Sequence, residues 1–215
     1  MIKILKFSFL FIFGICFSQI NVDEIKKKVT ENPQQYYFEY LENFKKDPSK
    51  LIQEEMNQLY YGSRFIKSDY SMADYNKDYE EVWKIASRRG ISKTKAQKIL
   101  ERTEAAYNKA PLNREILASM VNIYNAIGEK KKAEICVLQN NRIIKTIDES
   151  GTGKTESSPI CVITPGDMMT FAKPIMMMGN TFKQKDIKTD KSSMMTEYSN
   201  NGVSLFVKCI GCFNF

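Results

Sequence analysis

Histidine is missing from this chain of 215 residues, and tryptophan occurs once. Without an imidazole the chain has no Ser-His-Asp or Cys-His catalytic group and no histidine ligand for a metal ion. It also has no side chain whose ordinary pKa lies near neutral pH. The sequence therefore excludes the enzymes that depend on histidine, histidine-based metal sites and the usual switch at physiological pH.

Long apolar runs are also scarce, and the one that occurs lies at the start of the chain. Lys3 and Lys6 precede this run, and the small residues Cys16 and Ser18 stand three positions and one position before a cleavage point at Gln19. This pattern is typical of a secretory signal peptide. We predict a signal peptide over residues 1–18, cleavage after Ser18, and export to the periplasm or the extracellular space.

The mature chain, residues 19–215, lacks two further features. No segment approaches the about 20 apolar residues of a membrane span, so no transmembrane helix is predicted in it. Its 30 basic and 25 acidic residues are interleaved, and its lysine clusters at residues 26–28 and 130–132 are short. Solvated helix faces account for such clusters, so nucleic acid is not expected as a partner.

Residues 112–149 have the pattern of two helices joined at Gly128. In the first helix, residues 113–127, apolar side chains recur every three or four positions. The second helix, residues 129–149, is predicted to bury Ala133, Val137, Ile143, Ile144 and Ile147. Gly128 supplies the backbone freedom that a helix end needs. The two stripes are expected to pack against each other as an antiparallel helix pair.

The spacing within this pair resembles a tetratricopeptide repeat. Pro111, Leu117, Tyr124, Gly128 and Ala133 stand where that motif has its proline, large helix residues, turn glycine and alanine. One period earlier the match is degraded, because no glycine occupies the expected turn. A generic helical bundle is the alternative to repeat-like packing.

Apolar periodicity and capping residues predict further helices on both sides of a polar loop at residues 68–77. These helices are expected at residues 23–31, 34–46, 51–65, 78–89 and 93–109.

The character of the sequence changes at residue 151, after which segments are short, β-branched and rich in turns. Strands are predicted at residues 160–164, 181–189, 193–198 and 203–213, with one or two helical turns at residues 166–172. The fold class is therefore α+β, with tetratricopeptide-like antiparallel helix pairs in residues 19–150. A small, mostly antiparallel sheet in residues 151–215 is expected to pack on the last of these helices.

Several features, taken in order along the chain, resemble the uncharacterised exported family of Gram-negative bacteria known as domain of unknown function 4919. They are Tyr36-Tyr37, the tetrad Leu59-Tyr60-Tyr61-Gly62, the hairpin of residues 111–133, the turn at residues 150–154 and the strand at residues 160–164. The resemblance implies export and a helical part followed by a β part. It implies no catalytic residue.

Four cysteines remain in the mature chain: Cys136, Cys161, Cys209 and Cys212. Cys209 and Cys212 have thioredoxin-type spacing, but on a regular strand their side chains would point to opposite faces, and no helix N-terminus follows to lower a thiol pKa. The sequence leaves two alternatives open: buried free thiols, or a structural bridge such as Cys161 to Cys209.

Methionines gather in the same part of the chain, at residues 168, 169, 176, 177, 178, 194 and 195. Together these sulfur atoms suggest a soft-metal Cu(I) or thiol-redox protein as an alternative function.

Adjacent acids such as Glu54-Glu55 and Glu80-Glu81 lie in predicted amphipathic helices, where they are expected to be solvated. No catalytic residue, cofactor site or metal site is therefore predicted.

Tyrosines are plentiful in the helical part, and tyrosine is a good contact residue because it is rigid and amphipathic. The leading hypothesis is an exported, non-enzymatic interaction protein that binds an envelope protein or a peptide through a helical-repeat surface. The residues predicted to bind this partner are Tyr36, Tyr37, Tyr60 and Tyr61.

Overall fold

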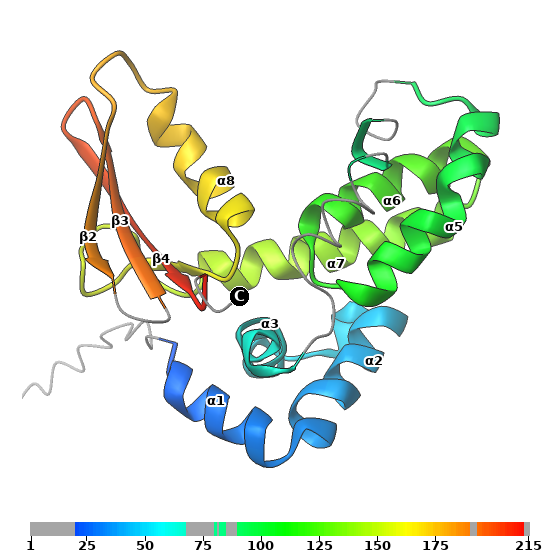
Figure 1. Ribbon diagram of the computed structural model, residues 1–215, viewed down its shortest axis with the longest axis horizontal. Coiled ribbons are helices and arrows are strands. Elements are labelled where there is room, and N and C mark those ends of the chain that lie inside the picture. The colour runs from blue at the N-terminus through cyan, green and yellow to red at the C-terminus, as the bar shows by residue number, and fades with distance from the viewer. Residues whose placement is uncertain (1–19, 68–79, 81, 85–89, 190–192, 213–215) are drawn as a thin grey trace, which may run out of the picture.

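The computed structural model describes residues 20–67, 80, 82–84, 90–189 and 193–212 (Figure 1). The predicted signal peptide at residues 1–18 and the predicted loop at residues 68–77 lie outside this part of the chain, as does most of the helix predicted at residues 78–89.

The first helices form a layer on one side of the molecule (Figure 1). Helix α1 is capped by Asn21, whose side chain accepts a hydrogen bond from the backbone N–H of Glu24 at 3.1 Å. A π-helical turn leads into α2, and Asp47 and Pro48 stop that helix and start a 3₁₀ turn. The elements of this layer are α1 (Val22–Glu31), η1 (Gln34–Phe38), α2 (Glu39–Lys46), η2 (Pro48–Lys50), α3 (Gln53–Gly62) and η3 (Ser63–Phe65).

Helices α5 (Lys93–Lys109), α6 (Arg114–Ile127) and α7 (Lys130–Asp148) form the second helical group. The side chain of Asn113 caps α6 by accepting hydrogen bonds from two backbone N–H groups. At Gly128 the backbone φ is +89°, and α7 begins two residues later. Helices α6 and α7 pack against each other along their length, which confirms the predicted helical hairpin.

A four-stranded sheet with the order β1-β4-β3-β2 forms the C-terminal part. Its strands are β1 (Ile160–Val162), β2 (Lys183–Thr189), β3 (Ser193–Asn200) and β4 (Val203–Ile210). Only β1 and β4 pair in parallel, which confirms an α+β fold with a mostly antiparallel sheet. Helix α8 (Pro165–Met176) packs on β3 and β4. It is longer than the predicted turns, because it continues through Pro174.

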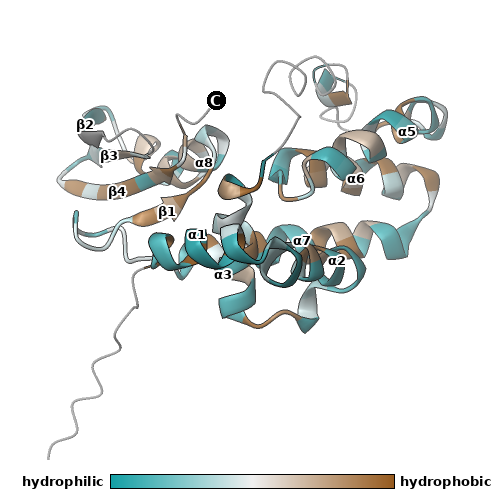
Figure 2. Ribbon diagram, turned by 60° about the horizontal axis from the view of Figure 1, so that its bottom comes forward, coloured by the Kyte–Doolittle hydropathy of each residue, from teal (hydrophilic) through white to brown (hydrophobic). Residues whose placement is uncertain are grey.

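The two parts of the chain meet at the end of α7, which packs on β1 (Figure 1). The buried apolar residues of both parts belong to one cluster. Hydrophobic residues line β1 and β4, whereas α1 carries mostly hydrophilic ones (Figure 2).

Within the helices, the buried side chain of Gln139 links three elements. It donates to the carbonyl of Phe44 at 2.9 Å and to the hydroxyl of Tyr107 at 2.8 Å, which ties α2, α5 and α7 together.

The turn at Gly128 gives a first prediction. A Cβ at this position would meet no atom within 4 Å, so Gly128→Ala should cost only the strain of a positive φ, about 1 kcal/mol of unfolding free energy. Gly166→Ala is the matched control: its φ is not in the left-handed region, and its Cβ would make ordinary contacts. Urea denaturation should show a loss for the first variant and none for the second. Equal effects would contradict this account of the turn.

Candidate functional site

Two of the predicted contact tyrosines lie inside the protein. Tyr60 and Tyr61 of α3 are both 0 % exposed, and their rings meet edge to face with centroids 5.0 Å apart. Burial raises the pKa of each hydroxyl well above its ordinary value. We therefore correct their assignment as partner-binding residues, because neither ring reaches the surface.

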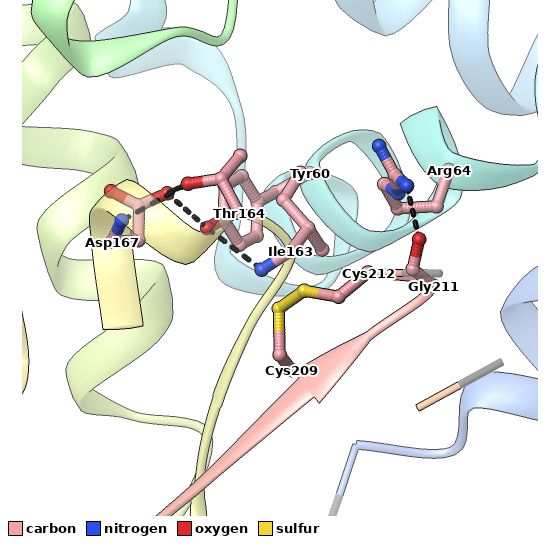
Figure 3. The surroundings of a disulfide bond; sticks show 8 residues. All are labelled: Tyr60, Arg64, Ile163, Thr164, Asp167, Cys209, Gly211 and Cys212. Carbon is pink, nitrogen blue, oxygen red and sulfur yellow. Dashed lines mark hydrogen bonds between the residues drawn. A yellow bond between two sulfur atoms is a disulfide. The ribbon is translucent and has the colours of Figure 1, made fainter. Parts of the chain in front are cut away.

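Both tyrosines instead form hydrogen bonds with the C-terminal part of the chain. The Tyr60 hydroxyl donates to Asp167 Oδ2 at 2.9 Å and accepts a hydrogen bond from the backbone N–H of Ile163 at 3.4 Å (Figure 3). The Tyr61 hydroxyl donates to the carbonyl oxygen of Cys161 at 2.9 Å. Helix α3 is thus hydrogen-bonded to the start of α8 and to β1.

Asp167 is the centre of this junction, and its side chain is only 6 % exposed. Arg114 of α6 donates to its Oδ1 at 2.9 Å, and Thr164 donates to its Oδ2 at 2.9 Å. The Asp167 backbone N–H donates in return to Thr164 Oγ1 at 3.0 Å, which caps α8. With Tyr60, three donors occupy both carboxylate oxygens. The arrangement suits a structural anchor, because the carboxylate is buried and both of its oxygens accept hydrogen bonds from within the protein.

The remaining predicted tyrosines lie elsewhere. Tyr36 is half-buried, with the Lys28 ammonium 6.0 Å from its ring centroid. Tyr37 is buried, and burial raises the pKa of its hydroxyl to about 12. Both belong to η1, which packs on α3, whereas the hydroxyls of Tyr60 and Tyr61 bond to α8 and β1. The four tyrosines therefore do not form one surface.

Cys209 and Cys212 pair with each other, although their side chains were predicted to point to opposite faces of a strand. Cys209 and Cys212 form a disulfide, whereas Cys136 and Cys161 are buried free thiols, so the suggested bridge from Cys161 to Cys209 is wrong. Strand β4 ends at Ile210, and Gly211 turns the backbone with a φ of +67°. This turn brings the two sulfur atoms together (Figure 3).

All four of these cysteines are buried, which keeps their sulfur atoms from solvent. Cys209 and Cys212 are 0 % and 5 % exposed and lie at the end of β4. The guanidinium of Arg64 donates to the carbonyl of Gly211, and burial lowers the pKa of this arginine. Burial also raises the pKa of both free thiols to about 11, so they stay protonated at neutral pH.

The methionines do not share one location. Met168 is buried, whereas Met169 and, at the other end of α8, Met177 and Met178 are exposed. Met194 lies on β3. Across the described part of the chain, no group of three or more cysteine, aspartate or glutamate side chains could hold a metal ion. In the same residues no helix has the length and apolar character of a membrane span.

Within the part of the chain that the structure describes, an exposed apolar surface lies on the α6–α7 hairpin. A groove of about 440 Å³ is lined mostly by apolar surface. Val137 and Leu138 expose 41 % and 47 % of their surface there. Val137 was predicted to be buried, but the buried side of α7 runs through Cys136, Gln139 and Ile143. We call this feature the hairpin groove; its lining residues are Asn125, Ala133, Glu134, Val137 and Leu138.

The sequence signal for the hairpin groove is the pair of consecutive apolar residues Val137 and Leu138. Neighbouring helix positions point about 100° apart, so Val137 and Leu138 cannot both face the core that Cys136 and Gln139 face.

Comparison with known proteins links most of the chain to one family. The family model described as a domain of unknown function, DUF4919, matches residues 23–203. No curated protein and no solved structure matches the chain.

The Asp167 junction gives a second prediction. Asp167→Ala leaves the half-buried guanidinium of Arg114 and the buried hydroxyl of Tyr60 without their acceptor, so the free energy of unfolding should fall by about 3 kcal/mol. The double variant Arg114→Ala/Asp167→Ala should lose less than the sum of the two single variants. Glu42→Ala, which breaks the exposed pair with Lys46, is the control and should change little. Additive losses at Arg114 and Asp167 would contradict the coupling.

Proposed function

Because the chain belongs to the family described as domain of unknown function DUF4919, we propose a function from its surface. The protein is an exported, non-enzymatic interaction protein. It binds a helical segment of an envelope protein or a peptide in the hairpin groove, on a helical part of tetratricopeptide-like design.

The hairpin groove is the observation that carries this proposal. Its volume of about 440 Å³ lies within the roughly 300–1,000 Å³ of ordinary binding pockets. Its apolar lining would gain free energy by leaving water, at about 25 cal/mol for each Å² covered. The exposed side chains of Val137 and Leu138 are the natural anchors, since a few desolvated residues usually provide most of the binding energy.

A helix is the occupant that suits this shape. The groove lies along the first half of α7 and beside the end of α6, so it has the form of a furrow between packed helices. An amphipathic helix places large side chains into such a furrow at positions three and four apart. Glu134 contributes a negative charge to the lining, which favours a helix with a basic residue beside its apolar anchor.

The alternative as a soft-metal or thiol-redox protein has less support. The disulfide sulfur atoms are closed off from a thiol substrate by burial, and the exposed methionines stand at opposite ends of α8. Met169 and Met177 are eight positions apart, about 12 Å along a helix, which is too far for two ligands of one ion.

Replacing Leu138 tests the proposal. The chain from Gln19 onward should capture a protein from an envelope extract of its native cells, and that protein, once identified and purified, should bind with a measurable Kd. Leu138→Asp should weaken this binding at least about tenfold, because it places a charge in the apolar contact. Met169→Asp on α8 is the control, since Met169 exposes the same 47 %. Equal binding by both variants and the unaltered chain would contradict the proposal.

A further inference from the structure

We propose that the helix accepted by the hairpin groove is α7 of a second copy of this chain, packed antiparallel on α7 of the first. This inference rests on the proposed function, because it names the partner of the same groove. It adds a defined arrangement, in which a twofold axis passes between Leu138 and Asn141.

The face of α7 that points away from the core is free to take part in such a contact. The buried residues of α7 form one stripe, and Glu134, Leu138 and Lys145 are exposed on the opposite side of the helix. A third apolar side chain borders the same surface. Ile52 is 62 % exposed and follows Leu51, whose carbonyl accepts a hydrogen bond from Arg142 of α7.

Charge complementarity identifies the occupant and its direction. The first turn of α7 is basic, with exposed Lys130 and Lys131, whereas Asp148 and Glu149 at its other end are acidic and exposed. In an antiparallel pair centred between Leu138 and Asn141, each basic end faces the acidic end of the other copy.

The same register places Glu134 opposite Lys145 of the second copy, and by symmetry this contact forms twice. Lys145 already lies 3.6 Å from Glu149 of its own helix, so it is directed along the exposed face. A parallel pair would instead place like charges opposite each other, which disfavours it. Opposite charges thus select antiparallel packing around the apolar side chain of Leu138, with Val137 at the edge of the contact.

The contact is expected to be weak and reversible. A single pair of helices about 28 Å long buries less than the roughly 1,600 Å² of a standard stable interface. Its charged contacts are exposed, so salt should weaken it further.

Sedimentation velocity on the chain from Gln19 onward tests the inference. Between about 1 µM and about 500 µM the mass should rise from monomer to dimer, with a larger Kd at high salt. Glu134→Lys and Lys145→Glu should each raise the Kd for self-association about tenfold, since each variant creates two repulsive contacts. Lys173→Glu, an equal change of charge on exposed α8, is the control and should leave the Kd unchanged.

Combining the two substitutions makes the test specific. The double variant Glu134→Lys/Lys145→Glu should associate as the unaltered chain does. A mixture of the two single variants should form heterodimers, because each then meets the opposite charge. If neither the double variant nor the mixture of single variants associates as the unaltered chain does, the antiparallel register is overturned, whether or not the unaltered chain forms a dimer.

A chain that stays monomeric over the whole concentration range would overturn the second copy as partner. That result would leave the proposed function standing if Leu138→Asp still abolishes binding of another purified protein. If Leu138→Asp loses self-association while the double variant Glu134→Lys/Lys145→Glu retains it, the result supports both the proposed function and the second copy as partner.

Discussion

The carboxylate of Asp167 is the interaction on which the rest of the structure depends. It accepts hydrogen bonds from Tyr60 of α3, Arg114 of α6 and Thr164 at the start of α8. These donors come from three elements that are far apart in the sequence. A buried carboxylate requires such partners, because an unpaired charge in the interior is costly. This requirement keeps the helical part and the sheet in one arrangement.

A second set of contacts extends the junction toward the sheet. The hydroxyl of Ser150 accepts a hydrogen bond from the backbone N–H of Cys161 at 2.7 Å, and the Tyr61 hydroxyl donates to the carbonyl of the same residue. Strand β1 is thereby held by both α3 and the end of α7, and β1 in turn pairs with β4. The C-terminal part is therefore packed onto the helices, and the outward face of α7 stays exposed.

Much of the fold was predictable from the sequence, because apolar spacing and turn residues are local signals. The helix at residues 113–127, its end at Gly128 and the strands on each side of Asn201 and Gly202 follow from such signals. The candidate site was less predictable. The pattern of α3 shows that Tyr60 and Tyr61 are large and amphipathic, but whether their hydroxyls meet water or Asp167 depends on a residue about one hundred positions later. The disulfide was missed for the opposite reason: Gly211 ends the strand, so the alternation of a regular strand does not apply to Cys212.

Native-state hydrogen exchange tests most directly whether the junction unites the two parts of the protein. If Asp167 and its partners couple them, the most protected amides of α6 and those of β4 should share one free energy of opening, which falls together as urea is added. Amides of β4 that exchange through an opening several kcal/mol less costly than that of α6 would contradict the account, since the sheet would then unfold while the helices remain intact.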